Sequence, residues 1–237
     1  MELDETLWYQ TLGFFNNPFS IKPAAFHEEL VGPQKIIKNI SNKIASGNVC
    51  FVLGAYGAGK TTMMKKIINR FRGEKKVIYY SCNRREGSIN FDELLYGRSW
   101  YSRVFRIKPK DMILLLDEVQ ELNRKEQLDV VDYYKDGYFQ SVALVTKGKR
   151  EVRLTNELKK LVGKNVFKLS NIKAKDVVDL VRRRIGPLPL LSDAMIKKIH
   201  KMNPNPRAIL ENCEDVCRHA VESGTDKVTA KHLKLIK

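Results

Sequence analysis

Residues 54–61 of this 237-residue chain read Gly-Ala-Tyr-Gly-Ala-Gly-Lys-Thr, which matches the pattern G-x-x-x-x-G-K-[ST] at every fixed position. An apolar run at 48–53 precedes this octapeptide and an amphipathic pattern at 60–71 follows it, so the octapeptide is expected to join a strand to a helix. Its glycines let the backbone turn so that successive N–H groups point inward at the positive end of that helix. The sequence therefore predicts a phosphate-binding loop rather than a flexible turn.

The loop supplies the side chains that a nucleoside triphosphate requires. We expect Lys60 to bridge the β- and γ-phosphates and Thr61 to hold Mg²⁺ through its hydroxyl. The expected cofactors are therefore ATP and Mg²⁺. The predicted nucleotide-binding residues of the loop are Gly54, Ala55, Tyr56, Gly57, Ala58, Gly59, Lys60, Thr61 and Thr62.

A second motif is the segment MILLLDEVQ at 112–120, in which an apolar run ends in Asp117 and Glu118. Such a strand places Asp117 at the carboxyl edge of the sheet, where open α/β sheets bind their ligands. Asp117 is therefore a predicted metal ligand together with Thr61, and Glu118 is predicted to polarise the attacking water. The alternative is that the two acids only cap a helix.

Short apolar runs alternate with helical patterns along the first two thirds of the chain. The runs are too short for buried helices and are rich in β-branched and aromatic residues, so they are predicted strands. Their alternation with helices predicts an α/β fold, a P-loop NTPase core with a five-stranded parallel sheet flanked by helices. The predicted strands are 48–53, 76–82, 112–116, 141–146 and 165–169, and the predicted helices between them include 60–71 and 125–136.

From about residue 172 the strand patterns stop and only helical patterns follow. We therefore expect a nucleotide-binding α/β core at 1–171 and a small all-helical domain at 172–237. Its predicted helices are 174–185, 192–202, 206–222 and a short last helix at 229–236.

The charge of the chain indicates a polyanionic partner. Lys and Arg number 43 against 27 Asp and Glu, a formal net charge of +16. Such an excess usually reflects binding to nucleic acid and sometimes to anionic lipid. The alternative is a lysine-rich surface whose charges are merely solvated.

The segment YGRSWYSRVFRIKPK at 96–110 interleaves cations with aromatic rings and contains no acid. Cations neutralise phosphates and rings stack on exposed bases, so this segment is the candidate DNA contact. The alternative is an amphipathic helix with its rings in the core. The candidate residues are Arg98, Trp100, Arg103, Arg106 and Lys108.

Neither a membrane span nor a disulfide framework is expected. No apolar stretch approaches the ~20 residues of a membrane helix, and the N-terminus MELDETLWYQ is acidic where a secretory signal is basic, so a cytoplasmic protein is expected. The four cysteines fit reduced thiols. Cys213 and Cys217, with His219 nearby, are weighed as metal ligands, but they continue an apolar stripe and are expected in a core.

These motifs, taken together over nearly the whole chain, resemble the AAA+ ATPases. The block FFNNPFSIKPAAFHEELVGPQKIIKNI at 14–40 resembles the segment before the first strand in the replication-initiator branch and in the secretion- and transposition-associated branches. The resemblance implies that this segment lies against adenine, which makes Leu30, Val31 and Gly32 candidates for contact with the base. The alternative is that Phe14, Phe15 and Phe19 staple the N-terminus to the core.

The resemblance also implies that the helical domain at 172–237 is a lid and that two residues act as sensors, of which the lid arginine is expected to contact the γ-phosphate. Thr146 ends the predicted strand ALVT at the position of the family's polar sensor, where asparagine is more usual. In NPNPRAIL, Asn205 and Pro206 fit a helix start, which places Arg207 in the first turn as the lid arginine. The expected catalytic residues are Lys60, Asp117, Glu118, Thr146 and Arg207.

An arginine finger, which the resemblance implies in oligomeric members, has no clear match. No arginine occurs between Arg153 and Arg182, and the corresponding stretch carries Lys159 and Lys160, which lack the bidentate fork. Either Arg150 or Arg153 serves this role, or hydrolysis is slow and the protein acts as a switch. A homo-oligomer or hetero-oligomer and a protein partner are expected.

Three functions remain open from the sequence. The first is an ATPase switch acting on DNA in replication or recombination, although no winged-helix pattern follows the lid and sequence-specific origin recognition is not expected. The second is an assembly ATPase acting on protein partners of a membrane-associated machine. The third is a nucleotide-binding module with little hydrolysis.

Overall fold

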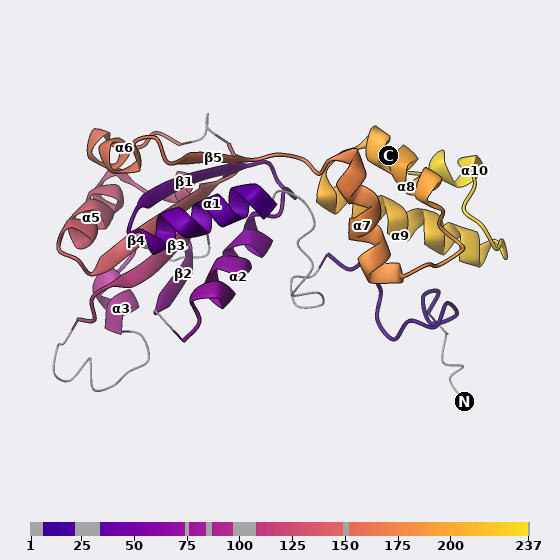
Figure 1. Ribbon diagram of the computed structural model, residues 1–237, viewed down its shortest axis with the longest axis horizontal. Coiled ribbons are helices and arrows are strands. Elements are labelled where there is room, and N and C mark those ends of the chain that lie inside the picture. The colour runs from indigo at the N-terminus through magenta and orange to yellow at the C-terminus, as the bar shows by residue number, and fades with distance from the viewer. Residues whose placement is uncertain are drawn as a thin grey trace. The chain divides into compact units, whose positions relative to one another are not determined.

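The computed structural model of the chain describes residues 7–21, 34–73, 76–83, 87–96, 108–148 and 152–236 (Figure 1). The chain divides into two compact units, each with its own hydrophobic core. We call them the sheet unit and the helical unit. The sheet unit comprises Lys35–Tyr56 and Met63–Ser170, and the helical unit comprises Met1–Gln34, Gly57–Thr62 and Asn171–Lys237.

Five parallel strands form the sheet, in the order β2-β3-β4-β1-β5. Every residue of β1 and β3 is buried, whereas the edge strands β2 and β5 are partly exposed. Continuous apolar runs are typical of parallel strands that are covered on both faces. The predicted five-stranded parallel sheet is therefore confirmed. The strands are β1 (Val49–Gly54), β2 (Val77–Ser81), β3 (Met112–Asp117), β4 (Phe139–Thr146) and β5 (Val166–Leu169).

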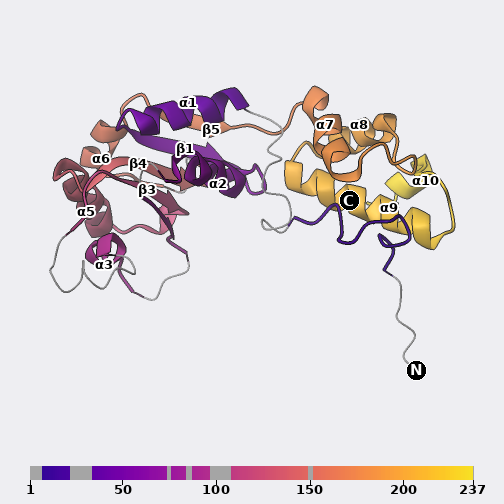
Figure 2. The same cartoon turned by 60° about the horizontal axis from the view of Figure 1, so that its bottom comes forward.

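Helices cover both faces of this sheet (Figures 1 and 2). Helices α3 (Phe91–Tyr96), α5 (Arg124–Lys135) and α6 (Asn156–Val162) pack with alternate residues of β1, β3 and β4 in one cluster. Helices α1 (Gln34–Ala45) and α2 (Lys60–Phe71) lie on the other face. Helix α2 has its predicted bounds, and α5 begins and ends one residue before its predicted bounds.

Four helices form the C-terminal part of the helical unit, namely α7 (Ala174–Ile185), α8 (Asp193–Met202), α9 (Pro206–Glu222) and α10 (Ala230–Leu233). Their apolar faces meet in one buried cluster, as the 3.6-residue period of these segments predicts. Helices α7 and α9 have their predicted bounds. The expected helical segments after the α/β core are therefore confirmed.

The N-terminal segment 7–21 packs on these helices. Phe19 is fully buried in their cluster and stacks on Trp8, with ring centroids 6.3 Å apart, and Phe14 packs against the same cluster. Phe15 is 90% exposed. Phe14 and Phe19 thus staple the N-terminal segment, but to the helical unit. The domain boundaries expected from the sequence, 1–171 and 172–237, stay a prediction.

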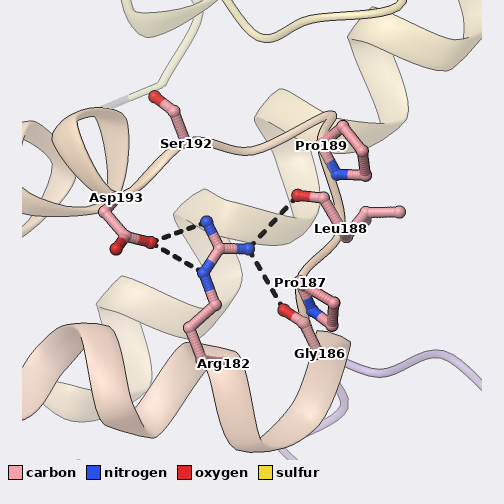
Figure 3. A pocket seen from close by; sticks show the side chains of 7 residues that line it. All are labelled: Arg182, Gly186, Pro187, Leu188, Pro189, Ser192 and Asp193. Atoms are coloured by element: carbon pink, nitrogen blue, oxygen red, sulfur yellow. Dashed lines mark hydrogen bonds and ion pairs between the residues drawn. The ribbon is translucent and has the colours of Figure 1, made fainter.

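Arg182 is the first of three consecutive arginines, 182–184, in the last turn of α7, and it holds the loop between α7 and α8 in place (Figure 3). Its guanidinium donates to Asp193 Oδ1 at 2.7 Å and to three backbone carbonyls at 2.7–3.2 Å. The loop is rich in proline and has few amide hydrogens of its own, so the arginine satisfies carbonyls that would otherwise lack donors. The charge of Arg182 is therefore used inside the fold. The carbonyls belong to Gly186, Leu188 and Leu191.

The other two arginines of this run also have partners in the helical unit. Arg183 Nε lies 3.0 Å from Asp179 Oδ1, one turn earlier on α7. Arg184 donates to the carbonyl oxygens of Pro18 and Ser20 at 3.3 and 2.9 Å, which ties the N-terminal segment to α7. The run therefore contributes to folding, and its charge is largely compensated locally.

All four cysteines are buried and free. Burial raises the pKa of Cys50 and of Cys217 to about 12, and it raises the pKa of Cys213 well above its usual value. Cys213 and Cys217 lie in the core of the helical unit, as expected from the apolar stripe. Among the described residues, no group of three or more His, Cys, Asp or Glu side chains could hold a metal ion.

We expect the native protein to resist thiol reagents. A thiol is reactive as the thiolate; all four thiols are buried, and burial raises the pKa of Cys50, Cys213 and Cys217. In a titration with a colorimetric disulfide reagent, the unfolded chain should react at all four cysteines, while the native chain should react at fewer than one during the same period. Rapid modification of two native thiols would contradict the burial described above.

Candidate functional site

The carboxyl ends of β1, β3 and β4 meet at one edge of the sheet unit. Leu53 of β1 is paired with Thr146 of β4, and Leu116 of β3 is paired with Leu144 of β4. Each strand therefore ends within two residues of its neighbour along this edge. Gly54, which begins the phosphate-binding loop, lies at the same edge as Asp117 and Thr146, as predicted.

The loop has the backbone that its glycines were expected to provide. Gly57 and Gly59 have φ angles of 76° and 85°, in the left-handed region where a side chain is unfavourable. Lys60 is the first residue of the 12-residue helix α2, and its side chain is largely buried. The loop amides thus lead directly into a helix N-terminus, which is a favourable place for phosphate.

Gly57 is also restricted by its surroundings within the helical unit. A Cβ atom built at Gly57 would lie 2.4 Å from Asn205 Oδ1 and 2.8 Å from Arg207 Cβ. Neither distance is compatible with a side chain at position 57. Glycine is therefore required at position 57 for two reasons, the positive φ angle and the close approach of the first residues of α9.

Asp117 ends β3 and is almost completely buried. Its Oδ1 accepts from the backbone N–H of Glu118 at 2.9 Å, and its Oδ2 accepts from the hydroxyl of Tyr79 at 3.3 Å. Tyr79 comes from the neighbouring strand β2 and was not singled out in the sequence. These two donors orient the carboxylate that we expect to hold the metal.

Glu118 has an unusual backbone conformation immediately after β3. Its φ and ψ are 56° and 45°, in the left-handed region, which costs a non-glycine residue about 1–2 kcal/mol. Such strain is typical of functional positions. The turn into the 3₁₀-helix η1 (Val119–Glu121) brings the Glu118 side chain, which is only 13% exposed, toward Gln120 and Lys147.

Thr146, Gln120 and Glu118 form a chain of hydrogen bonds, which we call the relay. The hydroxyl of Thr146 donates to Gln120 Oε1 at 2.8 Å, and Gln120 Nε2 donates to Glu118 Oε2. Lys147 Nζ lies 3.4 Å from the same Glu118 oxygen. The sequence predicted Thr146 and Glu118 as site residues but missed Gln120 and Lys147, which join them.

Arg207 lies in the first turn of α9, as expected. Asn205 caps this helix, since its Oδ1 accepts from the N–H groups of Arg207 and Ala208 at 3.0 and 3.4 Å. A cation is unfavourable at a helix N-terminus unless an anion is present. Here the Arg207 guanidinium pairs with Glu211 on the next turn, Nε to Oε1 at 2.8 Å.

The residues present fit a magnesium nucleotide. The loop has two glycines in the left-handed region, the backbone that a turn of amide groups around a phosphate requires. Thr61 supplies a hydroxyl and Asp117 a carboxylate, and oxygen ligands of this kind are those that Mg²⁺ prefers. Lys60 supplies a positive charge for the phosphates.

Several predicted residues are not placed at this site. Leu30, Val31, Arg98, Trp100, Arg103 and Arg106 lie outside the described residues. Lys108 is described and lies four residues before β3, at the opposite edge of the sheet from Asp117.

The charge of Lys108 is engaged within the sheet unit. Its Nζ lies 2.7 Å from Asp92 Oδ1 and 5.6 and 5.4 Å from the ring centroids of Tyr133 and Tyr138. The hydrogen bond to Asp92 raises the pKa of Lys108. In this structure Lys108 therefore serves the packing of α3 against α5, and its role in DNA binding stays a prediction.

Comparison with known proteins agrees with this geometry. The family described as "AAA domain" matches residues 46–174, which is more than half of the chain. Among curated proteins, ABC transporter G family member 25 of Oryza sativa subsp. japonica is 27% identical over 109 residues, which cover 38% of this chain and only 11% of that protein.

Solved structures similar to this chain include replication proteins. The ORC1 protein of Aeropyrum pernix in complex with DNA has a TM-score of 0.67 at 14% identity, over 88% of this chain and 65% of that chain. CDC6P of Pyrobaculum aerophilum has a TM-score of 0.66 at 14% identity, over 92% of this chain and 70% of that chain. Domain III of the Thermotoga maritima replication initiation protein DnaA has a TM-score of 0.60 at 18% identity, over 90% of this chain and 95% of that chain. At these identities the likeness concerns the fold.

Proposed function

This chain belongs to the AAA domain family, and on that basis we propose that it binds ATP with Mg²⁺, hydrolyses it slowly and acts as a nucleotide-dependent switch on DNA. The observation that carries the nucleotide part is the meeting of the loop's first residue, Asp117 and Thr146 at one edge of the sheet. Phosphoryl transfer depends mainly on positioning and charge stabilisation, and this edge provides both.

Each site residue has a role in this proposal. Lys60 binds the β- and γ-phosphates, Thr61 and Asp117 hold the metal, and Glu118 orients the attacking water. Bound Mg²⁺ would neutralise charge that develops on the phosphate oxygens. Arg207 pairs with Glu211 in this structure and would exchange this partner for a γ-phosphate oxygen. This exchange would let the lid respond to ATP.

The absence of arginine from α6 supports slow hydrolysis. Lys159 and Lys160 on α6 are exposed, and lysine cannot form a bidentate contact with phosphate. Arg153 is exposed as well, and its carbonyl accepts from Gln127 Nε2 at 3.3 Å, so its backbone is held against α5. We infer that Arg153 completes a neighbouring subunit's site in an oligomer and that turnover is low without this contact. Arg150 lies outside the described residues.

The DNA part of the proposal is supported by the net charge of +16 and by the likeness to a protein solved on DNA. The described residues limit where DNA would bind. Lys108 and the arginines 182–184 already have partners in the fold, whereas the predicted contacts Arg98, Trp100, Arg103 and Arg106 lie outside the described residues and stay the candidates.

We expect DNA binding to weaken steeply as salt is added. Each neutralised phosphate contributes about −0.9 to the slope of log affinity against log salt concentration, so two contacts alone would weaken binding about tenfold between 50 and 200 mM salt. Fluorescence anisotropy with a labelled oligonucleotide, with ATP, ADP or no nucleotide, measures the slope and its nucleotide dependence. Absent or salt-insensitive binding at low ionic strength would contradict a DNA switch.

A second candidate function is an assembly ATPase that acts on protein partners of a membrane-associated machine. The ion pairs of Lys108, Arg182 and Arg183 within the fold favour it, because carboxylates already compensate these three cations. None of the helices among the described residues is long and apolar enough to cross a membrane. Affinity capture that returns membrane-complex subunits, together with no measurable oligonucleotide binding, would support this candidate over the first.

A further inference from the structure

The relay joins two predicted site residues of the sheet unit, the polar sensor Thr146 and Glu118, which is expected to polarise the attacking water. Thr146 is completely buried at the end of β4, and Glu118 lies just beyond the end of β3. Gln120 spans the gap between them with one amide group. A movement of Gln120 therefore changes the hydrogen bonding of both residues.

The number of donors and acceptors on each side chain determines the direction of the hydrogen bonds in the relay. An ionised carboxylate can only accept, so Gln120 must present its NH₂ group to Glu118. Its carbonyl oxygen then faces Thr146 and can only accept, so Thr146 must donate its single hydroxyl proton to Gln120. The opposite amide orientation would place two acceptors, Gln120 Oε1 and Glu118 Oε2, against each other.

This arrangement makes two contacts of Thr146 mutually exclusive. A phosphate oxygen of a nucleotide also accepts hydrogen bonds, and threonine has one proton to give. Thr146 cannot donate to Gln120 and to a γ-phosphate oxygen at the same time. An asparagine at this position would have two donor hydrogens and would not face the same restriction.

The Glu118 carboxylate is held on one side only. Gln120 and Lys147 both contact Oε2, with Lys147 Nζ at 3.4 Å. Among the described residues, no hydrogen bond or ion pair is found at the other oxygen, Oε1. Oε1 is therefore able to accept a hydrogen bond from water, and its direction depends on what holds Oε2.

We propose that Gln120 is a positioning residue that links γ-phosphate binding at Thr146 to the orientation of Glu118. Without a γ-phosphate, Thr146 holds Gln120 and Gln120 holds Glu118. When Thr146 donates to a γ-phosphate, Gln120 loses this partner but keeps its contact with Glu118 Oε2, so the two side chains reorient together and Glu118 Oε1 is directed toward the water. The inference rests on the proposed function, because it requires that this edge binds ATP.

Nucleotide affinity, measured without turnover, tests whether Gln120 and the γ-phosphate compete for the hydroxyl proton of Thr146. In Gln120→Ala the Thr146 proton is no longer held by the amide, so ATP should bind about two- to tenfold more tightly than to the wild type, the range that one hydrogen bond accounts for. ADP lacks the γ-phosphate and should bind equally to both. The gain for ATP should disappear in the double variant Gln120→Ala, Thr146→Val. Titrations with fluorescent ATP and ADP analogues, at a temperature where hydrolysis is negligible, measure these affinities.

Turnover tests the positioning of Glu118. Gln120→Ala should lower kcat about tenfold while KM falls or stays constant, because Glu118 loses the contact that sets its orientation. Thr146→Val removes the hydroxyl and should lower kcat, whereas Thr146→Ser keeps the hydroxyl and should retain most of the wild-type kcat. Gln120→Met preserves length and apolar packing and serves as the second variant if Gln120→Ala unfolds. Glu121→Gln, in the same 3₁₀-helix but exposed, is the matched control and should behave as the wild type.

The outcomes distinguish the relay from the proposed function. If the wild type binds ATP, Lys60→Ala does not, and both Gln120 variants match the wild type in ATP affinity and kcat, the relay is overturned and the function stands. Equal tightening of ATP and ADP in Gln120→Ala also overturns the relay, since it would show a general effect on the pocket. A wild type that binds no nucleotide overturns the proposed function, and the relay with it.

Discussion

Replacement of Lys60 by alanine is expected to weaken ATP binding by about a hundredfold or more. Lys60 is the first residue of α2 and is largely buried, and we expect its ammonium group to contact two phosphates. Hydrogen bonds to charged groups contribute about 1.5–3 kcal/mol each, and the loss of two accounts for a factor of this size. Equilibrium titration with a fluorescent ATP analogue measures the change, and the far-UV circular dichroism of the variant shows whether it is folded.

A matched lysine on the same helix controls for the loss of positive charge. Lys65 lies five residues further along α2, and Lys65→Ala removes the same charge from the helix without touching the loop. We expect this variant to bind ATP within about twofold of the wild type, since Lys65 lies beyond the phosphate-binding loop and a partly exposed charge contributes little. Equal weakening in both lysine variants would show that Lys60 acts through net charge alone, which would contradict the phosphate-binding loop.

The architecture was predictable because its long elements carry strong patterns. All five strands and the helices α2, α5, α7, α8 and α9 lie near their predicted positions. Buried parallel strands appear as continuous apolar runs, and α9 begins with a proline after an asparagine cap. Helices α3 and α6 span six and seven residues, which is too short for a 3.6-residue period to stand out. Helix α1 begins inside the segment 14–40, which was interpreted through the family resemblance and not through its helical period.

The loop and Asp117 were predictable from sequence, but their supporting residues were not. The relay depends on a left-handed conformation at Glu118, and no glycine or asparagine marks that position. Tyr79 reaches Asp117 from an edge strand whose pairing is known only once the strand order is known. The pairing of Lys108 with Asp92 likewise joins segments 16 residues apart through the tertiary fold. Side-chain hydrogen bonds between elements leave no periodic pattern in the sequence.

Replacement of Glu118 by glutamine is expected to lower ATP turnover by about 10²–10⁴-fold, the usual contribution of a positioned general base. Glutamine has nearly the same shape, and its carbonyl oxygen can still accept from Gln120, so the turn after β3 and the relay should persist. ATP affinity should therefore stay within about threefold of the wild type, because Glu118 acts on the water and not on the phosphates. Steady-state turnover and analogue titration on the same preparation separate the two quantities.

The alternatives left open by the sequence make opposite predictions for this variant. In a nucleotide-binding module with little hydrolysis, Glu118→Gln would leave the low basal turnover unchanged. In a switch whose site is completed by a neighbouring subunit, the loss should be largest in the assembled state, where Arg153 of one copy meets the nucleotide of the next. Measuring turnover of the wild type and Glu118→Gln across a range of protein concentrations therefore tests both. A concentration-dependent wild-type rate that vanishes in the variant, while Glu121→Gln retains it, assigns the hydrolysis to Glu118.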